Sequence, residues 1–181
     1  MSMVSFATYR DRHLPVFAAA ALGLCVSAPL GAQTQQPATA PSVQPAPLPY
    51  GPVIVDRQAQ AALSAAEAEA RRLGYAVAIA IVEPSGDLVM FKKLEGTHYY
   101  TSDSAMNKAR SSARLKRPTR NFQEGVKTNP NLLSVIPGAV PAAGGVPITV
   151  DGKIIGAIGV STGRSLDLDE QIATAGANAV R

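Results

Sequence analysis

The stretch GGVPITVDGKIIGAIGVSTG, residues 144–163, decides the fold class of this chain. Two apolar runs, residues 146–150 and 153–161, flank the pair Asp151-Gly152. Asp-Gly suits the two-residue type I′ turn that joins antiparallel strands, so the stretch is predicted to be a β-hairpin. Pro147 has no N–H to donate, which places its strand at a sheet edge or places the residue at the start of the strand.

A second hairpin is predicted upstream of the first. Residues 75–82 are apolar on both alternating faces, as expected of a central strand that is covered on both sides. Residues 83–87 contain Pro, Ser, Gly and Asp, which favour a turn. Residues 88–92 are then predicted to return as the partner strand.

Three segments have the periodicity of amphipathic helices. The first begins with Asp56 as its predicted cap and runs to about residue 73, where Gly74 is expected to stop it. The second opens at Thr101 or Ser102 and is ended by Pro118. The third spans residues 166–180.

Between Pro118 and the hairpin of residues 144–163, the chain is predicted to be a loop. Residues 118–143 contain Pro130, Pro137 and Pro141, which prevent a long helix. The predicted fold class is therefore α/β (α+β). It has one antiparallel sheet of four to five strands with helices on its faces, in the order αββα-loop-ββα.

The first 32 residues are predicted to be a secretory signal peptide, cleaved after Ala32. A basic lead at residues 10–13 precedes an apolar run at residues 14–26. This run is shorter than the roughly 20 apolar residues that a membrane-spanning helix needs. The mature protein is therefore expected to be periplasmic or secreted.

Residues 33–52 carry six prolines among Gln, Ala, Ser and Thr, a composition typical of a disordered linker. Residues 53–181 follow as a single domain. Its Lys and Arg residues cluster only at 108–120, and the chain has no Trp, so a nucleic-acid partner is not expected.

The predicted signal peptide removes two chemically useful side chains. Cys25 is the only cysteine, and Leu24 before it is too large for a lipoprotein signal. The mature chain would then lack disulfides and thiolate metal sites. His98 becomes its only histidine once His13 is removed, which excludes zinc or copper sites built from several histidines of one chain.

Five blocks of the domain, taken in order, resemble one known family. They are the alanine-rich helix with residues 84–89, residues 94–96 with 102–109, residues 137–138 with 144–148, residues 152–161, and residues 166–170 with 175–177. Their order and spacing resemble the GlcG/HbpS-like haem-binding proteins (DUF336-type) over essentially all of residues 53–181. The resemblance implies a profilin-like fold, homo-oligomers, and binding of haem or another tetrapyrrole such as cobalamin.

His98 is the first candidate ligand of such a group. It lies in the run Thr97-His98-Tyr99-Tyr100, where members of the family tend to have small residues. A neutral imidazole can ligate haem iron, and Tyr99 and Tyr100 can stack on a porphyrin or hydrogen-bond to it. The alternative is an exposed loop histidine beside half-buried tyrosines.

The resemblance also implies a haem contact at Thr119, which chemistry alone would make a turn residue. Basic side chains of the second helix and its exit are candidates for the haem propionates, Lys108 and Arg114 foremost. The others in this group are Arg110, Lys116, Arg117 and Arg120. The alternative for the whole group is a solvated helix face.

Glycines and two acids complete the candidate set. Gly144 and Gly145 admit either a flat ligand or tight backbone packing, and no phosphate-loop motif accompanies them. Asp167 and Glu170 form an Asp-x-x-Glu pair that can hold iron, although acids at a helix N-terminus are favoured as partners of its dipole.

The sequence thus predicts an exported protein that binds haem or a related tetrapyrrole, in a cleft between subunits or under residues 118–143. Its role would be haem or iron sensing or uptake. Two other hypotheses stay open. One is an enzyme with cofactor-linked or haem-degrading chemistry, with His98 as acid or base, which is favoured less than a non-enzymatic role. The other is a non-haem oligomeric module of a metabolic operon.

Overall fold

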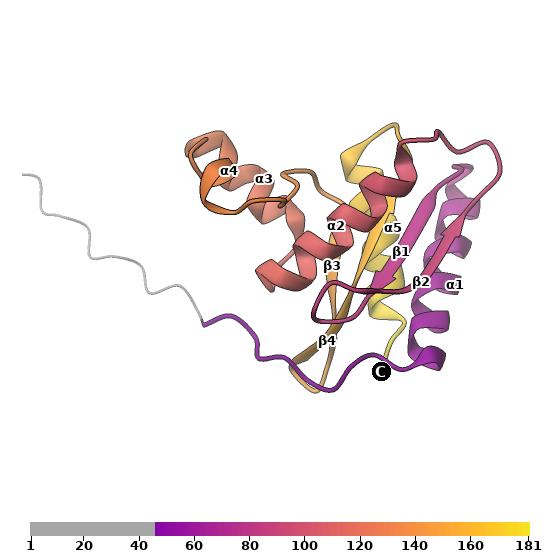
Figure 1. Cartoon of the computed structure of the whole chain (residues 1–181). Helices are drawn as coiled ribbons and strands as arrows, with labels where there is room; N and C mark the ends of the chain where they lie inside the picture. The colour runs from indigo at the N-terminus through magenta and orange to yellow at the C-terminus, as the bar shows by residue number, and fades with distance from the viewer. Residues whose placement is uncertain (1–45) are drawn as a thin grey trace, which may run out of the picture. The chain divides into compact units, whose positions relative to one another are not determined.

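Two β-hairpins lie edge to edge in the computed structural model, which describes residues 46–181. β1 (Ala78–Val82) pairs with β2 (Leu88–Lys93), and β3 (Gly145–Val150) pairs with β4 (Lys153–Ser161). Because β1 and β4 also pair, one antiparallel sheet runs in the order β2-β1-β4-β3 (Figure 1). The predicted α/β (α+β) fold class is confirmed, with four strands in the sheet.

The turn that the sequence placed at the centre of the second hairpin is confirmed. Asp151 has φ 49° and Gly152 has φ 70°, the two positive values that a type I′ turn requires. Pro147 lies in β3, which is an edge strand of the described sheet and pairs with a neighbour on one side only. A residue without an N–H donor is tolerated at such an edge.

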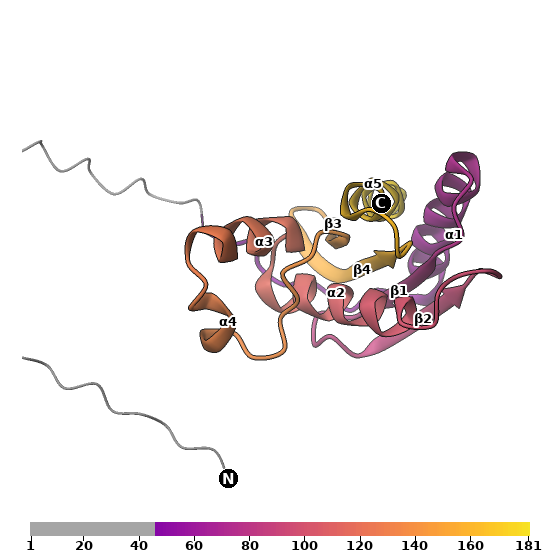
Figure 2. The ribbon, with the colours of Figure 1, turned by 90° about the horizontal axis from the view of Figure 1, so that it is seen from above.

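Helices cover both faces of the sheet (Figure 2). α1 (Asp56–Leu73) and α5 (Leu166–Asn178) lie on one face, and α2 (Thr101–Leu115) lies on the other. The α1/α5 side holds the larger core, in which the isoleucines and valines of the strands meet the alanines of both helices. The α2 side is a thinner layer of alanines with Val82, because small side chains let the helix backbone lie close to the sheet.

The prediction of a continuous loop over residues 118–143 was wrong. α3 (Thr119–Thr128) begins directly after Pro118, and the short α4 (Leu132–Val135) follows. Pro118 is the N-cap of α3, and the three later prolines all lie beyond Thr128. α2 ends before Pro118, at Leu115, where Lys116 is the C-cap with φ 55°. Phe122 is buried and fixes α3 to the body of the fold.

The N-terminal edge of the domain also differs from the prediction. Val55, and not Asp56, is the N-cap of α1, and Asp56 is the first helical residue. The end of the predicted linker lies against β4, since Gly51 N donates to Ile154 O at 2.8 Å and Ile154 N donates to Pro49 O at 2.9 Å.

The predicted secretory signal, residues 1–32, and residues 33–45 of the predicted linker lie outside the described residues. Within residues 46–181, none of the helices has the length and apolar character required to cross a membrane.

Candidate functional site

Most of the predicted site residues gather at one end of the sheet, where β4 ends, α5 begins and β3 starts. The centre of this end is a buried ion pair between the helices on opposite faces: Lys108 of α2 places its Nζ 2.6 Å from Oδ2 of Asp169 of α5. The two residues are 1% and 2% exposed. Lys108 also donates to the carbonyl of Val160, at 3.2 Å.

This position corrects the prediction that Lys108 belongs to a basic surface for ligand carboxylates. Its carboxylate partner is Asp169 of the same chain. Burial lowers the pKa of the Lys108 ammonium, and the charge and hydrogen bond of Asp169 act in the opposite direction. At this buried position, the loss of either charge would leave the other unpaired, at a large cost in folding free energy.

Asp169 was missed at the sequence level. Its Oδ1 accepts two hydrogen bonds from Thr162, from the backbone N and from Oγ1, each at 2.7 Å. The pattern that points to the pair is the helical spacing of Lys108 with Ala105 and Ala109, which places a lysine on the apolar face of α2. A buried lysine needs an acidic partner, and Asp169 of α5 lies within hydrogen-bond distance of it.

Gly144 and Gly145 make room for this pair rather than for a ligand. Gly144 has φ 115°, and a Cβ there would lie 2.7 Å from Cβ of Asp169 and 3.1 Å from Nζ of Lys108. A Cβ on Gly145 would collide with the backbone carbonyl of Lys108. Of the two alternatives left open by the sequence, tight packing is the one that the structure uses.

Thr119 is fully buried, and its hydroxyl is committed to the chain. Oγ1 donates to the carbonyl of Ala142 at 2.7 Å and accepts from the backbone N of Gly145 at 2.9 Å. These bonds tie the start of α3 to the start of β3. The hydroxyl therefore points into the fold and faces neither of the two cavities described below.

Asp167 and Glu170 both bind Arg120. The Arg120 guanidinium contacts Glu170 through Nε and lies 2.6 Å from Oδ1 of Asp167 through Nη2, and both hydrogen bonds raise its pKa. Their common partner fastens α3 to the N-terminus of α5. Within residues 46–181, no three His, Cys, Asp or Glu side chains stand close enough together to hold a metal ion.

His98 is an exposed residue on the loop between β2 and α2, outside this hydrogen-bond network. The ring stacks on Tyr100, with centroids 5.9 Å apart and planes at 18°. Its carbonyl accepts from the hydroxyl of Thr101 at 2.6 Å, which fixes the loop at the first turn of α2. No described residue donates to or accepts from its ring nitrogens.

A cavity of about 630 Å³ opens beside His98 and is lined by residues 93–99. Tyr99 is 94% exposed, and Nζ of Lys93 lies 4.8 Å from the centroid of its ring. Phe91 and Lys93 pair with Ala80 and Ala78, whose side chains face α2. Because α2 covers β1, β4 and β3 but not β2, the apolar ring of Phe91 stays partly open on this flank.

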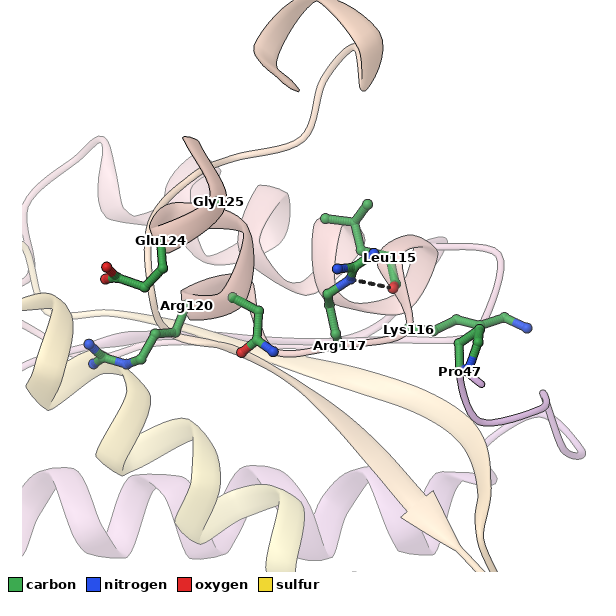
Figure 3. Close-up of a pocket in the computed structure, with 8 residues that line it drawn as sticks. Pro47, Leu115, Lys116, Arg117, Arg120, Glu124 and Gly125 are labelled. Atoms are coloured by element: carbon green, nitrogen blue, oxygen red, sulfur yellow. Dashed lines mark hydrogen bonds between the residues drawn. The ribbon is translucent and has the colours of Figure 1, made fainter. Parts of the chain in front are cut away.

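A second cavity, of about 770 Å³, lies where α2 meets α3 (Figure 3). Its basic side chains are Lys116, Arg117 and Arg120. Much of that charge is engaged already, because Arg120 binds two acids and Nζ of Lys116 lies 4.1 Å from the ring of Tyr50. Its lining offers no imidazole, thiolate or phenol to a metal.

The two cavities are at opposite ends of α2, whose 15 residues span about 22 Å at about 1.5 Å per residue. Arg114 lies near the far end, where its Nε donates to the carbonyl of Ser85 at 3.1 Å. One ligand on one chain therefore does not combine His98 with Arg114, Lys116 or Arg117. The predicted single set of ligand residues is divided by the fold.

Residues 54–178 match the family described as "Haem degrading protein HbpS-like". The chain belongs to the HbpS-like family. Protein GlcG of Escherichia coli K12 is 31% identical to this HbpS-like chain over 109 residues, which is 60% of this chain and 81% of GlcG. An uncharacterised 15.0 kDa protein of Citrobacter freundii, from the dhaT-dhaS intergenic region, is 28% identical over 103 residues, 55% of this chain and 72% of that protein.

Solved structures of HbpS-like proteins have the same fold. A double mutant of HbpS from Streptomyces reticuli superimposes with a TM-score of 0.68 at 32% identity, covering 80% of this chain and 99% of the other. The PduOC:heme complex superimposes with a TM-score of 0.66 at 25% identity, covering 71% and 96%. The family predicted from the sequence is confirmed, and one similar structure is a haem complex.

Proposed function

We propose that this HbpS-like protein is an exported binding protein for haem, or for a related tetrapyrrole such as cobalamin, and that the ligand lies on the His98 surface. This surface comprises His98, Tyr99, Phe91 and Lys93. The observation that carries the proposal is the exposed imidazole of His98, whose ring nitrogens have no hydrogen-bond partner among residues 46–181. The haem-bound relative and the family description support the ligand class.

The chemistry of the His98 surface fits haem. The imidazole supplies a donor for an axial position of the iron. Phe91 and the exposed ring of Tyr99 supply apolar contact, worth ~25 cal/mol per Å² of apolar area buried. Lys93 supplies a cation for a propionate. The cavity of about 630 Å³ is of the size found for small-molecule sites, roughly 300–1,000 Å³.

A second copy of the chain is part of the proposal. Binding sites bury about 70–90% of a ligand's surface, whereas the His98 surface lies on one side only, with Tyr99 almost wholly exposed. The neighbouring edge strand β2 exposes Leu88, Val89 and Phe91. A homo-oligomer that covers this flank would close the site over the other face of the ligand.

Export is supported by the basic lead and apolar run of residues 1–32. A binding protein outside the cytoplasm would capture haem before uptake or report its presence. The test is cell fractionation of the tagged full-length chain. Recovery of a shortened protein from the periplasm or medium is expected, and full-length protein confined to the cytoplasm would refute export.

The binding test is titration of the chain without residues 1–32 with hemin, followed by absorbance. The wild type is expected to give a red-shifted, saturable Soret band. His98→Ala is expected to lose the spectrum of an imidazole-ligated iron, and free imidazole should restore it. Arg117→Ala is the matched control, because it removes a cation from the other cavity and should bind as the wild type does. The absence of any saturable change in the absorbance spectrum with hemin, and likewise with cobalamin, would refute the proposal.

Haem degradation is the second candidate function, favoured by the family description. Its test adds ascorbate as reductant to the hemin complex under air. Loss of the Soret band with release of iron and a linear tetrapyrrole would identify an enzyme. A Soret band that persists would leave the protein a binding protein, and a defined oligomer that never binds hemin would favour the non-haem module.

A further inference from the structure

We infer that the buried Lys108–Asp169 pair positions the His98 ring, acting through the turn of residues 162–165. The inference rests on the proposed role of His98 as a haem ligand. It assigns Lys108, Asp169 and Thr162 as positioning residues, which touch no ligand themselves. The pair belongs to the helices, whereas the turn belongs to the segment between β4 and α5, and His98 belongs to a third segment.

The first link is the bond between Asp169 and Thr162. Oδ1 of Asp169 accepts from both the backbone N and the Oγ1 of Thr162, at 2.7 Å each. Oγ1 of Thr162 in turn accepts from the backbone N of Arg164 at 3.1 Å and of Ser165 at 3.4 Å. One carboxylate oxygen therefore fixes the residue that organises the whole turn.

The second link is the contact between the turn and the His98 ring. Gly163 has φ +72°, and a Cβ built on it would lie 2.6 Å from Cδ2 of His98 and 2.9 Å from Oη of Tyr100. The stacked pair of rings thus rests directly on the backbone of Gly163. A shift of this turn therefore moves Gly163, and with it the position of the imidazole that lies against it.

The third link is the charge of Lys108. Asp169 is almost wholly buried, and Lys108 is its cationic partner within the described residues. Without that ammonium the carboxylate is a buried, unpaired anion, which takes up a proton or turns toward water. Either change weakens its hold on Thr162. The position of His98 therefore depends on a lysine of α2 that contacts Asp169 and does not touch the turn itself.

The experiment compares Lys108→Met, Thr162→Val and Thr162→Ser with the wild type. Thr162→Val removes the hydroxyl at almost constant shape, and Thr162→Ser restores it. Leu63→Ala is the control for lost stability alone, because Leu63 is buried between α1 and the sheet and is not part of the chain of contacts from Lys108 to His98. Two readouts are measured: the nuclear Overhauser contact between the His98 ring and Gly163 Hα, and hemin affinity.

We expect the Overhauser contact to be present in the wild type, Leu63→Ala and Thr162→Ser, and to be lost in Lys108→Met and Thr162→Val. Hemin affinity should fall at least tenfold in Lys108→Met and Thr162→Val and stay near the wild-type value in Leu63→Ala and Thr162→Ser. An Overhauser contact that persists in folded Thr162→Val overturns the inference. If Lys108→Met does not fold, the result for Thr162→Val alone decides the inference. If the wild type binds no hemin, the proposed function fails, while the Overhauser contact still decides the positioning.

Discussion

Replacement of Lys108 by Met is the most informative single perturbation of stability. The ammonium and the Asp169 carboxylate lie 2.6 Å apart, and the two side chains are 2% and 3% exposed, so neither charge has water to replace its partner. Removal of one member of a buried pair costs about 3–5 kcal/mol. A domain of this size has a free energy of unfolding of about 5–15 kcal/mol, so the loss is a large share of the total.

The assay is urea unfolding of the wild type, Lys108→Met, Asp169→Leu and the double variant at pH 7, followed by circular dichroism. Each single variant should lose about 3–5 kcal/mol, and the double variant should lose less than the sum, because replacement of both charges leaves none unpaired. Its remaining deficit reflects the lost bonds to Thr162. A Lys108→Met variant within about 1 kcal/mol of the wild type would refute the interpretation of the pair.

Three further predictions concern the same end of the fold. Arg120→Ala should reduce the free energy of unfolding by only about 1 kcal/mol in urea, since its side chain is 33% exposed and solvent screens its pairs with Asp167 and Glu170; a loss above about 3 kcal/mol would contradict this. Gly163→Ala should lower the Tm more than Gly74→Ala: both have positive φ, at about 1–2 kcal/mol each, but only Gly163 also meets other side chains, so equal shifts would argue against the contact with the His98 loop. The lowered pKa of Lys108 means that the unfolded chain binds more protons between that pKa and about 10.4, so wild-type stability should rise with pH in this window; a pH profile parallel to that of Lys108→Met would contradict it.

The sequence predicted the fold to the extent that local chemistry sets it. The hairpin at Asp151-Gly152 follows from two residues that adopt positive φ, and the end of α1 follows from Gly74, with φ 76°. α3 was not predicted because residues 118–143 contain four prolines, a number that argues against a helix unless their positions are considered. Pro118 precedes the helix and the other three follow it, so none interrupts Thr119–Thr128.

The candidate site was predictable only in part. His98 and Tyr99, which the sequence predicted as candidate ligand residues, are exposed on one loop, whereas Lys93, at the end of β2, was not predicted. Lys108 was predicted as a surface cation because a lone sequence does not show which acid comes within reach of a lysine. Its partner lies 61 residues away on the opposite face of the sheet.

The sequence by itself determined the two hairpins, the helices that cover them and the family, because turns, periodicity and motif order depend on neighbouring residues. The tertiary structure alone decided that Lys108, Gly144, Gly145 and Thr119 hold the fold together, and that His98 is exposed while its ring lies against Gly163. The physical reason is that burial and charge pairing arise from contacts between segments far apart in the chain, and these contacts select which polar groups remain available to a ligand.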